Sequence, residues 1–136
     1  MLAVLAIGVF GVFLATPHRP ATDARVTMLD GRTVPISSLR GKVTAVSFWA
    51  TWCGVCIREM PRMAEAWHRH APRGYEMIAI AVRDEKEKVS EFSARRALPF
   101  RVAMDAGDAA QRFGNVRITP TTFLLDREGR VIKRFV

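Results

Sequence analysis

Hydrophobic and polar residues follow two periods along the chain, and these predict short strands interleaved with helices. Val43 to Phe48 is a short, mostly apolar run, as expected for a strand covered on both faces. From Gly54 to Ala71, apolar residues recur every three or four positions and mark one stripe of a helix of about five turns. Pro72 and Gly74 then end this helix. The pattern therefore predicts a buried strand that leads directly into an amphipathic helix.

The remaining elements continue this alternation on both sides of the first strand and helix. Strands that alternate with helices are typical of an α/β sandwich, here with a mostly parallel sheet and helices on both faces. The other predicted elements are a hairpin over Arg25 to Pro35 turning at Asp30-Gly31, a strand over Met77 to Val82, a helix over Lys86 to Ala97, a strand over Phe100 to Met104, a short helix ended by Gly114, and antiparallel strands over Thr121 to Leu125 and Val131 to Phe135.

The first residues of the chain are apolar and uncharged. Leu2 to Ala15 would span about 21 Å as a helix, which is short for a bilayer of about 30 Å. We therefore expect a signal peptide or membrane anchor over residues 1–16, a linker over residues 17–24 and one domain over residues 25–136. This division favours a periplasmic or other extracytoplasmic domain, tethered to the inner membrane if the segment is retained. A buried N-terminal helix is the alternative, although the segment has no polar face.

Composition supports a single globular domain and limits the classes of partner that it could bind. The chain has 136 residues, of which 49% are hydrophobic and 25% charged. Its net charge of +8 comes from Lys and Arg residues that are scattered singly among acids. No Gly-rich phosphate loop or aromatic–basic RNA-binding pattern is present. We therefore expect a basic surface and no nucleic-acid partner.

The two cysteines, Cys53 and Cys56, carry the clearest chemical signal. A structural disulfide usually closes a longer loop, so a pair separated by two residues indicates chemistry instead. Cys53 falls where the predicted strand ends and the helix begins, and free N–H groups there would stabilise a thiolate. Cys56 follows one turn later on the same helical face and is expected to be more buried. These positions predict that Cys53 attacks a disulfide and that Cys56 resolves the mixed disulfide.

Zinc or copper binding is an alternative, because His68 and His70 follow the cysteines at a spacing similar to that of a two-Cys, two-His finger. On the predicted helix, however, His68 would lie about 18 Å along the axis from Cys56. Residues two apart on a helix also face different directions. We therefore expect the histidines to be surface residues and predict no metal site.

The segment Phe48-Trp49-Ala50-Thr51-Trp52-Cys53-Gly54-Val55-Cys56 resembles the active-site strand and helix of thioredoxin-like proteins. Gly114 to Asp126, which contains Thr119-Pro120-Thr121, is similar to the family's second hallmark segment. The resemblance covers residues 25 to 136 and implies a thioredoxin-like three-layer α/β/α sandwich with an N-terminal β-hairpin. It also implies thiol:disulfide oxidoreductase activity with no cofactor beyond the redox-active disulfide of Cys53 and Cys56.

Within this superfamily the chain is most similar to the exported, often membrane-tethered TlpA/ResA group. Ser47 stands where thioredoxin proper has a buried aspartate, and Glu59 and Pro61 match the Glu-x-Pro of the tethered reductases. Glu59 lies three residues beyond Cys56, where a carboxylate could handle the proton of the resolving thiol. An exposed acid favoured by the helix dipole is an equal alternative for Glu59.

The resemblance also assigns a substrate-binding surface. It implies a cis peptide bond at Pro120 beside the disulfide, with backbone groups of Thr119 receiving an extended substrate segment. A plain strand-starting proline is the alternative. Trp52 is expected to flank the exposed sulfur as a contact surface, and Trp49 to fill the core.

The chain departs from the family pattern at two points. Val55 replaces the proline common before the second cysteine, which leaves the reduction potential open. No closing helix follows the last strand, so we expect a fold without the family's C-terminal helix.

The leading hypothesis is a monomeric, extracytoplasmic reductase of protein disulfides, such as those of haem-attachment cysteines in cytochrome c maturation. A membrane thiol carrier would supply its electrons. The alternatives are a disulfide oxidase or isomerase, which differs in potential, and a metal-handling or non-catalytic binding module.

Overall fold

The computed structural model describes residues 21–136, which fold around one seven-stranded sheet. The strands lie in the order β2-β1-β5-β4-β3-β6-β7. The elements are the 3-10 helices η1 (Ala21–Asp23), η2 (Ile36–Leu39) and η3 (Ala71–Arg73), the strands β1 (Arg25–Met28), β2 (Thr33–Pro35), β3 (Val43–Trp49), β4 (Tyr75–Ala81), β5 (Arg101–Asp105), β6 (Thr121–Leu125) and β7 (Val131–Phe135), and the helices α1 (Gly54–His70), α2 (Lys86–Arg96) and α3 (Ala109–Arg112).

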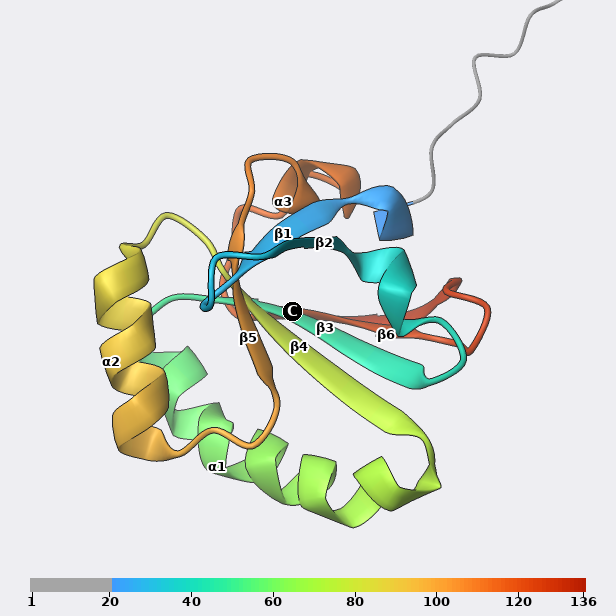
Figure 1. Ribbon diagram of the computed structural model, residues 1–136, viewed down its shortest axis with the longest axis horizontal. Helices are drawn as coiled ribbons and strands as arrows, with labels where there is room; N and C mark the ends of the chain where they lie inside the picture. Colours follow the sequence, from blue (N-terminus) through green and yellow to red (C-terminus); the bar gives the residue numbers. More distant parts are fainter. Residues whose placement is uncertain (1–20) are drawn as a thin grey trace, which may run out of the picture.

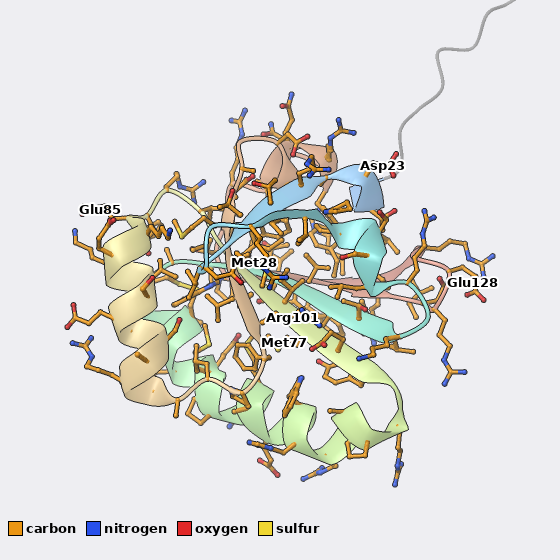
Figure 2. The ribbon with its side chains drawn as sticks, in the orientation of Figure 1. Asp23, Met28, Met77, Glu85, Arg101 and Glu128 are labelled. Carbon is orange, nitrogen blue, oxygen red and sulfur yellow. A yellow bond between two sulfur atoms is a disulfide. The ribbon has the colours of Figure 1, made fainter. Side chains whose placement is uncertain are left out.

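Two hydrophobic clusters lie on opposite faces of the sheet and make three layers. α1 and α2 cover one face, and α3 with the turns of η1 and η2 covers the other (Figure 1). Successive residues of β3 point to opposite faces, so Phe48 enters one cluster and Trp49 the other. The side chains of both clusters fill the space between the sheet and its flanking elements (Figure 2). The structure confirms the predicted α/β sandwich, its N-terminal hairpin and the order of its elements.

The prediction of a mostly parallel sheet is wrong. Only the pairs β3–β4 and β4–β5 are parallel, whereas β1–β2, β1–β5, β3–β6 and β6–β7 are antiparallel. The alternation of strands and helices correctly predicts the three central strands. It does not reveal that the N-terminal hairpin joins the same sheet through β5, because that pairing links Val26 to Asp105, far along the sequence.

Residues just before the predicted domain boundary at Arg25 also pack into the core. Thr22 and Ala24 are buried, and the Ala24 N–H donates to the Ala21 carbonyl. The linker predicted over residues 17–24 therefore overlaps the domain at residues 21–24. The signal peptide or anchor predicted over residues 1–16 lies outside the described residues. Among the helices of residues 21–136, none is long and apolar enough to cross a membrane.

The parallel strands deliver the functional loops to one end of the sheet. β3 and β4 run in register from Val43 opposite Tyr75 to Trp49 opposite Ala81, so the segments that follow both strands meet at their carboxyl ends. One of these segments leads into α1 and the other precedes α2. β6 starts at this same end, because it pairs antiparallel with β3 and places Thr121 opposite Phe48.

Candidate active site

Cys53 and Cys56 form a disulfide at the start of α1, with their Cα atoms 5.3 Å apart. Cys53 is the residue that caps the helix, and its Sγ accepts a hydrogen bond from the Cys56 N–H at 3.2 Å. The exposed fraction is 7% for Cys53 and 1% for Cys56. Cys53 is therefore the more accessible sulfur, and it sits where the unpaired N–H groups of the helix would favour a thiolate.

The loop before β6 brings a second segment against Cys53. The Thr119–Pro120 peptide bond is cis, as the resemblance implies. The Thr119 carbonyl oxygen lies 3.6 Å from the Cys53 Sγ. This sulfur carries no hydrogen in the disulfide, so the contact can become a hydrogen bond only after reduction to the thiol. The Thr121 hydroxyl donates to the Ile118 carbonyl at 2.7 Å and ties this loop to the start of β6.

The segment after β4 supports the cysteine loop through two residues that the sequence analysis missed. Asp84 accepts hydrogen bonds from the Thr51 N–H at 2.6 Å and the Thr51 hydroxyl at 3.1 Å. The Trp52 indole N–H donates to the Arg83 carbonyl at 2.9 Å. The sequence did contain a signal for both residues. Arg83 and Asp84 directly follow the strand predicted over Met77 to Val82, and neighbouring parallel strands end side by side.

The two tryptophans near the cysteines differ in burial as predicted. The Trp52 side chain is 58% exposed beside Cys53. Trp49 is fully buried, and its ring lies 5.3 Å from that of Phe92 on α2. The Trp49 indole N–H has no hydrogen-bond partner in the described part of the chain.

Glu59 lines a cavity that neither cysteine lines. No hydrogen bond joins its carboxylate to either cysteine within residues 21–136. It is half-buried and lines a cavity of about 240 Å³ between α1 and the sheet, which Thr122 also lines. The Thr122 hydroxyl is 2.9 Å from the hydroxyl of Ser47, the residue that replaces the buried aspartate of thioredoxin. The structure therefore brings Cys53, Cys56, Trp52, Thr119 and Pro120 together and leaves Glu59 on the neighbouring cavity.

The histidines lie at the opposite end of α1. His68 and His70 are exposed, and their rings pack beside Trp67 and Tyr75. Residues 21–136 contain no group of three His, Cys, Asp or Glu side chains that could hold a metal ion.

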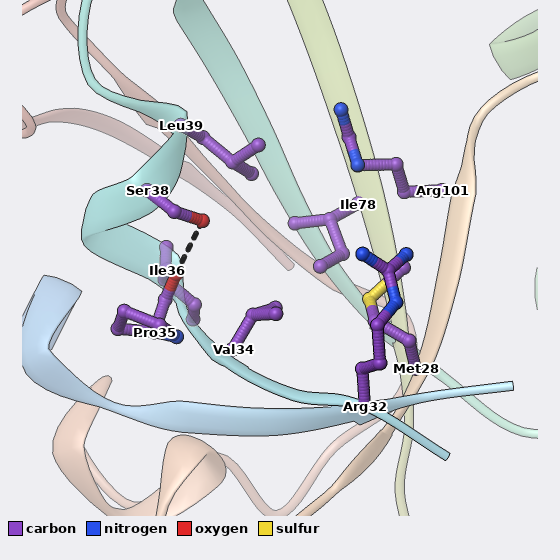
Figure 3. Close-up of a pocket in the computed structure, with 9 residues that line it drawn as sticks. All are labelled: Met28, Arg32, Val34, Pro35, Ile36, Ser38, Leu39, Ile78 and Arg101. Atoms are coloured by element: carbon purple, nitrogen blue, oxygen red, sulfur yellow. Dashed lines mark hydrogen bonds between the residues drawn. The ribbon is translucent and has the colours of Figure 1, made fainter. Parts of the chain in front are cut away.

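A larger cavity of about 290 Å³ lies between the N-terminal hairpin, η2 and the central strands (Figure 3). Ile78 and Ile36 give it an apolar floor, while Arg32 and Arg101 stand at its edge. Both arginines donate from Nε to carboxylates, Arg32 to Asp30 and Arg101 to Glu76. None of the residues that line this cavity belongs to the cysteine site.

The fold and the cysteine site together define a thioredoxin-like thiol:disulfide oxidoreductase. The chain belongs to the AhpC/TSA family, whose sequence profile matches residues 17–134. It is 34% identical over 118 residues to a thiol-disulfide oxidoreductase ResA of Bacillus cereus, covering 87% of this chain and 68% of that protein. It is 39% identical over 111 residues to ResA of Geobacillus kaustophilus, covering 82% and 64%. The chain thus spans about two thirds of the length of these relatives.

Solved structures share the same fold. A thiol:disulfide interchange protein of the thioredoxin family from Chlorobium tepidum TLS superposes with a TM-score of 0.74 at 30% identity, covering 87% of this chain and 86% of its own. A secreted Mycobacterium tuberculosis disulfide oxidoreductase, described as homologous to E. coli DsbE, superposes with a TM-score of 0.72 at 25% identity, covering 82% and 81%. These similarities confirm the family and the type of chemistry that the sequence motifs predicted.

Proposed function

We propose that this chain is an extracytoplasmic reductase of protein disulfides that uses its own cysteine pair and no other cofactor. In the reduced protein, the Cys53 thiolate attacks a substrate disulfide, so one substrate sulfur leaves as a thiolate and a mixed disulfide forms. Cys56 then attacks the Cys53 sulfur, which releases the second substrate thiol and forms the Cys53–Cys56 disulfide. Two electrons thereby pass to the substrate, and a thiol donor at the membrane returns them to the chain.

The observation that carries the reducing direction is the surroundings of the Cys53 sulfur. It accepts one backbone N–H, from Cys56, and it faces the carbonyl oxygen of Thr119. A carbonyl oxygen favours the thiol over the thiolate, because it accepts a hydrogen bond from S–H and repels negative charge. Strong oxidants of this type owe their potential to a stabilised reduced form. The Thr119 carbonyl therefore limits the stabilisation that the start of α1 gives the Cys53 thiolate, and this supports a reductant.

The surroundings of the pair also suit a protein substrate. Trp52 presents an exposed apolar surface next to Cys53, and Thr119 offers backbone groups to an extended segment on the other side. A segment that carries a disulfide, such as one formed by haem-attachment cysteines during cytochrome c maturation, would fit between them. The secreted relative from Mycobacterium tuberculosis supports a location outside the cytoplasm.

Glu59 is proposed to act through the cavity that it shares with Thr122. A carboxylate there could take the proton of the Cys56 thiol by way of water when that thiol resolves the mixed disulfide.

The reduction potential of the cysteine pair tests the proposed direction. Equilibration of the full chain with glutathione or dithiothreitol should give a value near or below about −220 mV. A value near about −120 mV would contradict a reductase and indicate a disulfide donor. Cys53→Ser should reduce insulin disulfides at the background rate, whereas Cys56→Ser should accumulate a mixed disulfide. Persistent activity in Cys53→Ser would remove Cys53 as the nucleophile.

A further inference from the structure

Arg83 adopts an unusual backbone conformation beside the cysteine site. It lies two residues after the end of β4. Its φ of +51° is in the left-handed region, which residues other than glycine rarely adopt. This conformation leaves its carbonyl oxygen facing the Trp52 indole N–H, at 2.9 Å from the indole nitrogen. Unfavourable backbone conformations persist where surrounding contacts hold them, and here the contacts belong to the site.

The Arg83 side chain contacts both sides of the site. Its guanidinium carbon lies 5.7 Å from the centre of the Trp52 ring, which is within the range of a cation–π interaction. Its terminal nitrogen donates to the Arg117 carbonyl at 3.1 Å. Trp52 precedes Cys53, and Arg117 precedes the Thr119–Pro120 turn that touches the Cys53 sulfur. Arg83 therefore fixes the two segments that flank the nucleophile relative to each other.

The apolar surface around the disulfide is exposed on both of these segments. Trp52 is 58% exposed and Val55 45% exposed on the side of α1, and Ile118 is 64% exposed on the other side. Large apolar side chains that gather beside a reactive group on a protein surface mark an interaction site.

Positive charges without an ion-pair partner outnumber negative ones near this surface. Arg83, Arg117 and Arg58 are exposed at this end of the molecule, and none of them forms an ion pair within the described residues. Of the two acids beside Arg83, Asp84 keeps its negative charge but points it at neutral donors of the loop, and Glu85 is paired with a lysine on α2.

Given the reductase function proposed above, we infer that Arg83 is a positioning and specificity-determining residue. It holds Trp52 and the Thr119–Pro120 turn at the spacing that an extended substrate segment needs. With Arg117, it gives the surface around Cys53 a preference for protein segments that carry Asp or Glu beside the disulfide. Charge complementarity of this kind acts mainly on the association rate and weakens as salt increases.

The test measures exchange with two synthetic peptides that share one intramolecular disulfide and differ only in flanking residues, acidic or basic. The full chain carrying Cys56→Ser stops at the mixed disulfide, so its second-order rate reports recognition by the surface around Cys53 and does not depend on the direction of electron flow. At low salt, we expect the acidic peptide to react about tenfold faster than the basic one. At about 0.5 M salt, most of this difference should disappear.

Two substitutions at one position separate charge from geometry. Arg83→Gln should remove most of the preference at low salt. At about 0.5 M salt, where charges are screened, it should also slow both peptides about threefold, because the Trp52 contact is lost. Arg83→Lys should keep the preference for acidic flanks but show the same threefold slowing, since an ammonium group lacks the planar guanidinium face. Quenching of tryptophan fluorescence by the neutral quencher acrylamide should increase in both variants, because Trp52 loses the guanidinium that covers its ring.

Arg73→Gln is the matched control, because it removes an equal charge at the opposite end of β4, in η3. It should change neither the preference nor the quenching. Equal rates for the two peptides in the parent protein, or equal losses in Arg83→Gln and Arg73→Gln, would overturn the inference. The reduction potential is measured separately. A strongly oxidising value would therefore refute the reductase while the peptide preference still decides the role of Arg83.

Discussion

The polar atoms at the two ends of the parallel strands β3 and β4 differ in how fully they are hydrogen-bonded. At the amino end, the Glu76 carboxylate is buried and has several donors: the Met77 N–H at 2.9 Å, the Trp67 indole at 3.1 Å and the Arg101 guanidinium at 3.1 Å. At the carboxyl end, the Cys53 sulfur has one N–H donor and a carbonyl oxygen as neighbours. The Glu76 carboxylate at the amino end is therefore fully hydrogen-bonded, whereas the reactive Cys53 sulfur at the carboxyl end has a single donor.

This difference separates stability from reactivity within one sheet. Burial alone would raise the pKa of Glu76, but its hydrogen bonds from Met77, Trp67 and Arg101, and the charge of Arg101, outweigh burial and lower the pKa. These contacts join α1, β4 and β5 far from the cysteines. The cysteine end can then keep exposed apolar residues and an unfavourable backbone at Arg83, because the fold is held together elsewhere.

Glu76→Ala should produce the largest change in stability and no change in chemistry. Removal of the carboxylate leaves the Met77 N–H and the Trp67 indole without an acceptor, so the free energy of unfolding should fall by about 2–3 kcal/mol. Urea denaturation measures this loss. The reduction potential of the cysteine pair should stay within about 5 mV of the parent value, since a larger shift would mean that the two ends are coupled.

Glu65→Ala is the control for this substitution. Glu65 also lies on α1 and pairs with Arg69, but both side chains are about two-thirds exposed. Its loss should cost less than about 0.5 kcal/mol. Equal costs for Glu65→Ala and Glu76→Ala would contradict the stabilising role assigned to the buried network.

The order of elements could be predicted from the sequence, because the periods of β3, α1 and β4 are local properties of the chain. The nucleophile was equally visible, since Cys53 falls at a strand-to-helix junction. The antiparallel pairing of β1 with β5 could not be predicted, because it depends on residues nearly eighty positions apart, such as Val26 and Asp105.

Two polar residues show why the surroundings of the site escaped prediction. Glu76 reads as an ordinary surface acid, because its partners Trp67 and Arg101 come from separate elements. Arg83 reads as a loop cation, because its contacts with Trp52 and Arg117 appear only when the loops at the carboxyl ends of the strands are folded together. Local patterns reveal strands, helices and motifs, whereas partners across the fold require the topology.

Glu76 should also make the free energy of unfolding depend on pH, which is a smaller effect than its replacement by alanine. Folding lowers the pKa of Glu76, so its charged form contributes stability that is complete above the ordinary glutamate pKa of about 4.3 and is lost as the pH falls through the lower folded value. The stability gap between the parent protein and Glu76→Gln should therefore be constant near neutral pH and narrow below about pH 4. Denaturant titrations of both proteins at a series of pH values measure this gap. The contributions of the other carboxylates are the same in both proteins and cancel in the difference. A gap that widens on acidification would show that the folded protein prefers protonated Glu76.

The smallest expected effect is at Val55, between the two cysteines. As the second residue of α1, Val55 contributes one of the first-turn N–H groups that have no partner within a helix, and together these groups make the start of α1 electropositive. Val55→Pro removes this N–H at a position where proline is tolerated, so it should disfavour the thiolate and lower the reduction potential by about 10–30 mV. Val55→Ala keeps the N–H and should leave the potential unchanged. If Val55→Ala shifts the potential as far as Val55→Pro does, the exposed side chain sets the value and the backbone donor does not. If Val55→Pro alone shifts it, then the few donors at the carboxyl end of the sheet control the potential, as the contrast with the fully satisfied Glu76 predicts.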